Sequence, residues 1–217
     1  MYTPPAYAEK DEALLRACMR QWSFATLVTH GAQGVQATHL PFLVDEPSAA
    51  EAAQGGHGTL VTHLARHNAQ FADLQAGAGA LVIFQGPHAF ISPSWYENRH
   101  TFPTWNYTAV HARGQPELIE SPEGLLAVLD RVVAHYDTPL GGPWRFRDMP
   151  ADFTATRLRA IAALRIPIAS LEGKMKLNQD KSVADRRGVI AALEQQGDAQ
   201  ALAVAGLIRA QPDMQAA

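Results

Sequence analysis

The segment Gly86–Tyr107 combines aromatic side chains with short polar ones, a composition that suits a planar ligand. Its prolines and aromatics are interleaved with five short polar residues, His88, Ser92, Ser94, Thr104 and Asn106. Aromatic faces stack on a flat ring, and a few donors and acceptors orient it. A loop of this composition is costly to order unless packing or a function requires it. The segment therefore predicts a binding loop for a planar molecule.

The run Thr62–Asn68 predicts a phosphate site. The pattern indicates a strand over Thr59–His63 that passes into a helix over Arg66–Leu74. The free N–H groups and positive dipole at a helix start, together with the Arg66 guanidinium, would suit an anion. An ordinary helix start that carries a surface arginine fits the same residues.

The run Ala37–Phe42 is a third candidate. Alternation places Thr38 and Leu40 on one strand face and His39 on the other. Pro41 indicates a strand edge or end, where backbone amides are free to meet a ligand. A barrel strand with a bulge is the alternative interpretation.

Metal and nucleophile chemistry have weaker signals. His63 and His67 are four residues apart, but no cluster of Asp, Glu or Cys accompanies them, so no metal site is predicted. Haem stays open, because one histidine can be an axial ligand without any spacing signature. Ser92 and Ser94 flank a proline with no nucleophile-elbow pattern, so a hydrolase triad is not indicated.

The composition is that of a folded protein, and the chain has no excess of positive charge that would favour nucleic acid. The 217 residues are 47% hydrophobic and 18% charged, with a net charge of −3 and a pI of about 6.3. The single cysteine, Cys18, allows no internal disulfide, which agrees with a reducing cytoplasm. No apolar run reaches the roughly 20 residues that span a bilayer, so we expect a soluble cytoplasmic protein with no membrane partner.

One stretch leaves DNA open as a partner. It gathers five basic residues ahead of the tail helices: Lys174, Lys176, Lys181, Arg186 and Arg187. Such a stretch could contact DNA or reach a ligand phosphate. Acidic residues are interleaved with it and no helix-turn-helix spacing follows, so a solvated helix face is the favoured interpretation.

The remaining elements alternate between short strands and a few helices. Turn glycines Gly31 and Gly34 predict a hairpin between Phe24–Thr29 and Val35–Val44. Further strands are expected at Ala80–Phe84, His88–Ser92, Tyr107–Arg113, Leu118–Glu120 and Arg165–Glu172. Helices are expected at Glu9–Trp22, from Ser121-Pro122, at Asp152–Ala163 and twice within Ser182–Ala210, separated at Gly197-Asp198. We expect Asp45–Gly58 to be a surface excursion. Short strands at hairpin spacing favour a small antiparallel barrel over a doubly wound sheet.

These motifs together resemble the PaiB-like FMN-binding negative transcriptional regulators, from the first residue to about residue 182. The matching runs are Met1–Pro4, Thr38–Pro41, His63–Asn68, Gly86–Tyr96, Pro103–Tyr107 and Lys176–Gln179. The Gly86–Tyr107 block carries most of the specificity, and the others occur in the family's order.

The resemblance implies an α+β, mainly β fold: a split antiparallel β-barrel of the pyridoxamine-phosphate-oxidase type, with peripheral helices and FMN in a homodimer. Residues 1–180 would form this FMN-binding domain, and residues 181–217 a C-terminal helical extension packed on the barrel or on the partner. By position, Arg66 and Asn68 would lie near the flavin phosphate, with Thr38 and His39 beside the ring or ribityl chain. The other implied cofactor-binding residues are His63, Thr104, Trp105, Asn106, Lys176 and Gln179.

The resemblance leaves the role open between two classes. The first is a negative transcriptional regulator or redox sensor. The second is a flavin-dependent oxidoreductase, or a haem-binding or haem-degrading relative on the same barrel. The chain also departs from the family, since Asp180 stands where the family has asparagine and adds a negative charge near the expected phosphate pocket.

Overall fold

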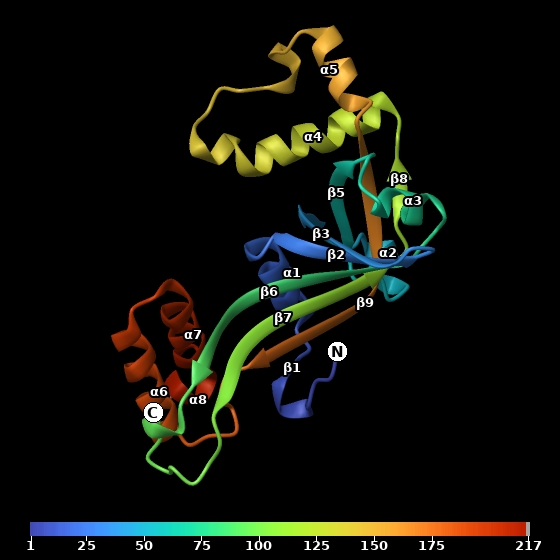
Figure 1. Ribbon diagram of the computed structural model, residues 1–217. Helices are drawn as coiled ribbons and strands as arrows, with labels where there is room; N and C mark the ends of the chain where they lie inside the picture. The colour runs from blue at the N-terminus through green and yellow to red at the C-terminus, as the bar shows by residue number, and fades with distance from the viewer. Residues whose placement is uncertain (216–217) are drawn as a thin grey trace. The chain divides into compact units, whose positions relative to one another are not determined.

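The computed structural model describes residues 1–215, which divide into two units (Figure 1). Unit 1 contains Met1–Asp11, Gln85–Val110 and Glu172–Ala217, and unit 2 contains Glu12–Phe84 and His111–Leu171. Long strands cross from one unit to the other, so each unit is assembled from segments far apart in sequence.

Helices and strands alternate along the chain. The helices are α1 (Glu12–Gln21), α2 (Ala49–Ala53), α3 (Gln70–Gln75), α4 (Pro122–Tyr136), α5 (Ala151–Leu158), α6 (Val183–Gln196), α7 (Ala199–Arg209) and α8 (Pro212–Gln215), with 3-10 turns η1 (Pro5–Tyr7), η2 (Pro93–Trp95), η3 (Thr138–Leu140) and η4 (Phe146–Asp148). The strands are β1 (Ala8–Glu9), β2 (Phe24–Gly31), β3 (Gly34–Pro41), β4 (Leu43–Asp45), β5 (Thr59–Ala65), β6 (Ala80–Ile91), β7 (Thr104–Gly114), β8 (Glu117–Ile119) and β9 (Ile161–Lys176).

The described strands form a nine-stranded sheet in the order β3-β2-β6-β7-β9-β5-β4, with β1 and β8 also paired to β9. The β2–β3 hairpin closes with Gly31 opposite Gly34, and Gly34 has a φ of 90°. Glycine adopts that backbone conformation without the steric cost that a side chain would bring. The predicted hairpin is confirmed, and β3 lies at the edge of the sheet and ends at Pro41, as the proline indicated.

Unit 2 carries the helices that cover β4 and β5. The apolar face of α4 packs Leu125, Val128 and Leu129 with Leu43, Val61, Ala163 and Leu158 of α5. The predicted start of α4 is confirmed, because Ser121 Oγ accepts a hydrogen bond from Gly124 N at 3.1 Å and Pro122 opens the helix. Burial of this face on the strands holds α4 and α5 in place.

Unit 1 contains the C-terminal helices. Residues Val189, Ile190 and Leu193 of α6 pack with Val204 and Ile208 of α7, and Figure 1 shows the two helices side by side. The same apolar cluster includes Leu177 and, from the Gly86–Tyr107 segment, Ala89, Ile91 and Tyr96. The predicted helix break at Gly197-Asp198 is confirmed, with Gly197 left-handed and Asp198 Oδ1 capping α7 at 2.9 Å.

Three expectations about elements are wrong. The helix predicted over Arg66–Leu74 begins only at Gln70, because β5 stays paired with β9 as far as Ala65. The predicted helix over Asp152–Ala163 ends at Leu158, and residues from Ile161 belong to β9. The strands predicted at Ala80–Phe84 and His88–Ser92 are one strand, β6. The surface excursion Asp45–Gly58 lies between β4 and β5 as expected, and it also contains α2, which Ser48 and Glu51 cap reciprocally.

The predicted division at residue 180 stays a prediction. Unit 1 groups the tail helices with residues 85–110, which lie within the expected barrel domain. No helix among residues 1–215 is both long enough and apolar enough to cross a bilayer.

Candidate functional site

The ten predicted site residues fall into two groups, one in each unit. The unit-2 group contains Thr38, His39, His63, Arg66 and Asn68, and the unit-1 group contains Thr104, Trp105, Asn106, Lys176 and Gln179. Each group is described in its own unit.

In the unit-2 group, the structure brings Thr38 and Asn68 together. Asn68 Nδ2 donates to Thr38 Oγ1 at 2.8 Å, and Asn68 Oδ1 accepts from Gln70 N at 2.9 Å. The second bond is a side-chain turn that leads into α3. Asn68 thus links the turn to the edge strand β3 through Nδ2 and to the start of α3 through Oδ1. The side chains of Asn68 and Thr38 both remain partly exposed.

Arg66 lies in the turn after β5 and is not at a helix start. Its Nε donates to the Ile161 carbonyl at 2.9 Å, its Nη1 pairs with Glu120 at 2.5 Å, and its guanidinium lies 5.1 Å from the centre of the Phe71 ring. The helix start predicted at Arg66 is therefore wrong, since α3 is six residues long and starts four residues later, whereas an anion site at the Arg66 guanidinium stays a prediction. The guanidinium itself is fixed, with Nη2 free of hydrogen bonds to the described residues.

His39 projects from the exposed face of β3. Its Nδ1 is 3.0 Å from Thr26 Oγ1 on β2, and its ring stacks on Phe24 with centroids 6.3 Å apart. Phe24 is 71% exposed, which is high for a phenylalanine. The edge of the sheet therefore presents an aromatic pair to its surroundings.

His63, on β5, has a largely buried ring. Its Nδ1 is buried and has no partner within the described residues. Burial lowers the pKa of His63 below its usual 6.5, because the charged imidazolium loses its hydration. The ring is therefore neutral at pH 7. His67 is exposed in the turn, so the two histidines do not share a helix face.

In the unit-1 group, Lys176 and Thr104 are joined. Lys176 Nζ donates to Thr104 Oγ1, and the same ammonium lies 5.8 Å from the centre of the Tyr7 ring. Lys176 is at the end of β9 and has no carboxylate partner among the described residues. Its charge is available to an anion.

Asn106 is the most unusual side chain of the unit-1 group. It is fully buried on β7, yet neither Nδ2 nor Oδ1 has a hydrogen-bond partner in the structure. Buried amides are nearly always paired, and each unmet group costs free energy. The neighbouring Trp105 is 53% exposed and lies beside the rings of His88 and Phe90, at 6.1 and 6.0 Å. His88 Nδ1 is likewise buried without a partner.

Gln179 closes the turn after β9 instead of pointing to a ligand. Its Oε1 accepts from Leu177 N at 2.7 Å, and its Nε2 donates to the Met175 carbonyl. The turn contains Asn178, which has a φ of 63° and whose Nδ2 donates to the buried Tyr96 hydroxyl at 2.8 Å. Asparagine tolerates this conformation better than most residues.

The negative charge of Asp180 is locally compensated. Asp180 pairs with Lys181 at 3.0 Å, and its carboxylate lies near the Tyr7 hydroxyl. Burial and the nearby Asp180 carboxylate both raise the pKa of Tyr7, and the hydrogen bond to Asp180 raises the pKa of Lys181. No motif pointed to Tyr7, because Tyr7 and Asp180 are far apart in the sequence.

The basic stretch before the tail is mostly engaged within the protein. Lys174 is 6% exposed, donates to the Tyr2 carbonyl at 3.1 Å and lies 5.0 Å from the centre of the Tyr107 ring. Arg186 is 3% exposed and binds Asp213 and Gln211. With Lys181 paired to Asp180, few of these charges remain for a nucleic acid.

Other chemistry that the sequence raised finds little support. Among residues 1–215, no group of three His, Cys, Asp or Glu side chains could hold a metal ion. Ser92 Oγ accepts from Ser94 N at 3.2 Å and so caps the turn η2.

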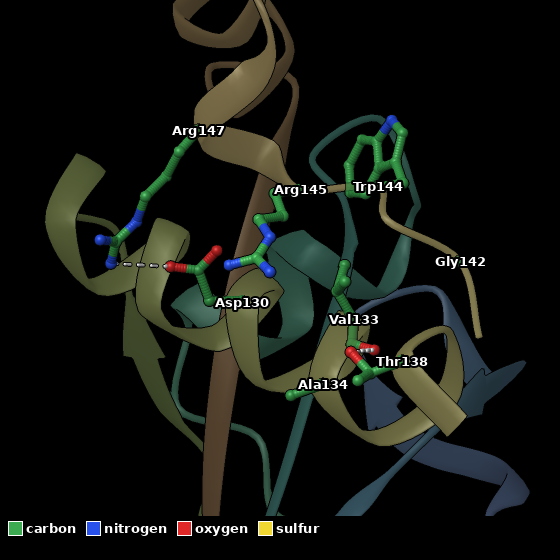
Figure 2. Close-up of a pocket in the computed structure, with 8 residues that line it drawn as sticks. All are labelled: Asp130, Val133, Ala134, Thr138, Gly142, Trp144, Arg145 and Arg147. Carbon is green, nitrogen blue, oxygen red and sulfur yellow. Dashed lines mark hydrogen bonds and ion pairs between the residues drawn. The ribbon is translucent and has the colours of Figure 1, made fainter. Parts of the chain in front are cut away.

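A separate cavity of about 350 Å³ lies in unit 2 between α4 and the segment that follows it (Figure 2). Arg147 reaches Asp130 of α4 at 3.5 Å, and the figure shows Arg145 extending toward the same helix, with Trp144 beside it. None of the ten predicted site residues lines this cavity.

Comparison with known proteins establishes the class. Residues 1–170 match the family model described as "Putative FMN-binding domain". The chain belongs to this FMN-binding family, which confirms the resemblance seen in its motifs. The Bacillus subtilis (strain 168) "Protease synthase and sporulation protein PAI 2" is 29% identical over 211 residues, which cover 96% of each chain.

Solved structures agree on the fold. The FAD and heme binding protein from Mycobacterium smegmatis has a TM-score of 0.59 at 18% identity, over 86% of this chain and 80% of that one. The flavocytochrome Anf3 from Azotobacter vinelandii has a TM-score of 0.56 at 14% identity, over 78% and 69%. The predicted α+β split-barrel class is confirmed.

Proposed function

We propose that this protein binds FMN as a cytoplasmic homodimer and acts as a flavin-dependent redox sensor in negative regulation of transcription. The family match over residues 1–170 supports FMN, and the PAI 2 relative is named a protease synthase and sporulation protein. Bound FMN would supply reversible electron transfer. The chain's own residues would bind and orient it.

The observation that carries the proposal is the unpaired amide of Asn106. A buried side chain with a free donor and a free acceptor fits the edge of a flavin ring, which offers alternating acceptors and donors. Trp105 precedes Asn106 on the same strand, and its exposed ring offers a stacking surface on the opposite face of β7. The residues present therefore suit a planar, polar-edged cofactor.

Each of the two groups offers a cation as a candidate for the phosphate of FMN. In unit 1, Lys176 has no carboxylate partner among the described residues, and in unit 2, Arg66 keeps Nη2 free while its other nitrogens fix the guanidinium plane. Around Arg66, the unit-2 group also contains Asn68, Thr38, His39 and His63. In the unit-1 group, Thr104 would position the Lys176 ammonium, and Gln179 would hold the turn that follows it.

The test compares FMN with riboflavin, which has the same ring and no phosphate. Flavin fluorescence during titration should show FMN binding at least tenfold tighter, a difference of about 1.4 kcal/mol. Arg66→Gln and Lys176→Gln should reduce that preference, while Arg187→Gln, an exposed basic control, should leave it unchanged. Equal affinities for the two flavins would contradict phosphate recognition.

The dimer has its own support and its own test. Large aromatic side chains are exposed in unit 1, namely Phe90 (47%), Phe102 (87%) and Trp105 (53%). Apolar exposure on this scale is typical of surfaces that another chain covers. Sedimentation velocity should show a dimer, and Phe102→Ser should weaken it; a monomer at about 100 µM would contradict the proposal.

Haem is the second candidate, and His63 is the observation that favours it. A neutral imidazole with an unpaired, buried nitrogen has the protonation state that iron ligation requires. Adding haem should then give a Soret band that His63→Ala abolishes, and NAD(P)H turnover with FMN present would favour an oxidoreductase. Without a His63-dependent band, the haem alternative is wrong.

A further inference from the structure

A second concave site in unit 2 is distinct from the cavity of Figure 2. Its volume is about 510 Å³, within the range of pockets that bind small molecules. The lining residues come from the turn after β5, the start of α4 and the end of α5: Arg66, Glu120, Pro122, Leu125, Ala155, Leu158 and Arg159.

The apolar part of this pocket belongs to the core. Leu125 and Leu158 are 2% and 8% exposed and are packed in the cluster beneath α4 and α5. A floor made of packed core side chains keeps its shape when a ligand enters, because those residues are already fixed. Pro122 and Ala155 extend the apolar wall. The pocket can therefore cover an apolar body.

The charged part of the pocket has one cation in excess. Glu120 is neutralised by Arg66, which also binds the Ile161 carbonyl. The Arg159 guanidinium donates to Thr156 Oγ1 at 3.2 Å and pairs with no carboxylate of the described residues. A guanidinium presents several donors in a plane that matches a carboxylate.

We propose that this pocket binds a small monoanion with an apolar body, an aryl or branched alkyl carboxylate, whose carboxylate is received by Arg159. The apolar body would lie against Leu125 and Leu158. A ligand with two or more negative charges fits less well, because Glu120 lies in the same pocket and only one cation is unpaired. The proposal does not rest on FMN binding, but Arg66 lines this pocket and is also a candidate for the FMN phosphate, so the test is done without FMN.

The experiment uses the full chain without FMN and 4-phenylbutyrate as the probe, followed by ¹H–¹³C NMR of leucine methyl groups. We expect saturable shifts of Leu125 and Leu158 at probe concentrations up to about 10 mM. The neutral 4-phenylbutyramide should bind at least about tenfold more weakly, since it lacks the charge that Arg159 would receive.

Variants test the contribution of the Arg159 charge separately from that of the apolar cavity. Arg159→Gln should weaken 4-phenylbutyrate about tenfold and leave the amide unchanged, whereas Ala155→Trp should fill the pocket and abolish both. Arg157→Gln is the matched control, because Arg157 is on the same helix but lies over the Phe153 ring, 5.1 Å from its centre. Equal binding of acid and amide, or shifts that Arg159→Gln does not change, would overturn the proposal, as would the absence of shifts at Leu125 and Leu158. The dispersion of each NMR spectrum reports whether the variant is folded.

Discussion

At single residues, the side chains of greatest interest for cofactor binding are buried ones with unpaired hydrogen-bonding atoms. Asn106 and His88 are buried in unit 1 with unmet hydrogen-bonding atoms, an arrangement that costs stability unless something else compensates. The sequence placed the negative charge of Asp180 near the expected phosphate pocket, but this charge is neutralised by Lys181 at 3.0 Å. The polar groups left unpaired are thus of greater functional interest than the extra charge.

Asn106→Leu tests whether this cost serves ligand binding. Replacing an unpaired amide by an apolar side chain of similar size should leave the free energy of unfolding unchanged or raise it by about 1 kcal/mol. FMN affinity should fall at least about tenfold. Urea unfolding and flavin titration measure the two effects.

Thr108→Val is the control on the same strand. It removes a satisfied bond from Thr108 Oγ1 to the Pro87 carbonyl, at 3.3 Å, and should lower stability by about 1 kcal/mol without changing FMN affinity. A loss of stability in Asn106→Leu with unchanged FMN binding would mean that the amide has a structural partner.

His63 predicts a pH dependence of stability. Its folded-state pKa is lowered by burial, so below about pH 6.5 the unfolded chain takes up this proton before the folded chain does. The free energy of unfolding should therefore decrease as the pH falls from 6.5 through the folded-state pKa, by at most about 1.4 kcal/mol per pH unit. Urea unfolding across this range should show a shallower acid limb in His63→Gln.

The exposed His67 gives the matched control. His67→Gln should leave the acid limb as in the wild type, because His67 is exposed in the turn after β5 and lacks the burial that acts on His63. An acid limb that His63→Gln does not change would show that other groups cause it.

Among the helices and strands, close packing fixes the C-terminal helices α6 and α7 on the Gly86–Tyr107 segment. A Cβ added at Gly188 of α6 would lie 2.1 Å from the Trp95 carbonyl oxygen, whereas a Cβ at Gly206 of α7 would meet nothing within 4 Å. The two glycines are both inside helices, where alanine is intrinsically favoured. The difference between them isolates the contact of α6 with η2.

We expect Gly206→Ala to raise the free energy of unfolding by about 0.5–1 kcal/mol. Gly188→Ala should lower it, because the clash is with backbone and exceeds the gain in helix propensity. Thermal or urea unfolding of the pair gives the answer. If both variants are stabilised, α6 does not pack on Trp95 as described.

Local signals in the sequence predicted those elements whose determinants are local. Ser121-Pro122 marked the start of α4, Gly31 and Gly34 marked the hairpin, and Gly197-Asp198 marked the break between α6 and α7. The helix at Arg66 was wrong because β5 is extended by pairing with Ile161, about a hundred residues further along the chain. Glu120, the partner of Arg66, was missed for the same reason, and so was the contact of Tyr7 with Asp180.

Across the whole molecule, the distribution of charge is compatible with flavin binding and disfavours direct DNA binding. The chain has a net charge of −3, and Lys174, Lys181 and Arg186 of the basic stretch are engaged with other residues. If this protein regulates transcription, it would therefore make few contacts of its own with DNA phosphates. Its role would then depend on the flavin or on a partner.

Affinity for duplex DNA should accordingly show a weak dependence on salt. Between about 50 and 200 mM salt, fluorescence anisotropy should change the apparent affinity by less than about tenfold, because few counterions are released. A loss of about a thousandfold would show an extensive phosphate interface and contradict this reading of the basic stretch.

Membership of the FMN-binding family is tested most simply by titrating the purified protein with FMN. Any ligand that co-purifies is removed first, and binding is followed by visible absorption and flavin fluorescence. We expect saturable binding of one FMN per chain with a dissociation constant well below about 100 µM. Flavin bands that do not change, with no saturation at that concentration, would contradict it.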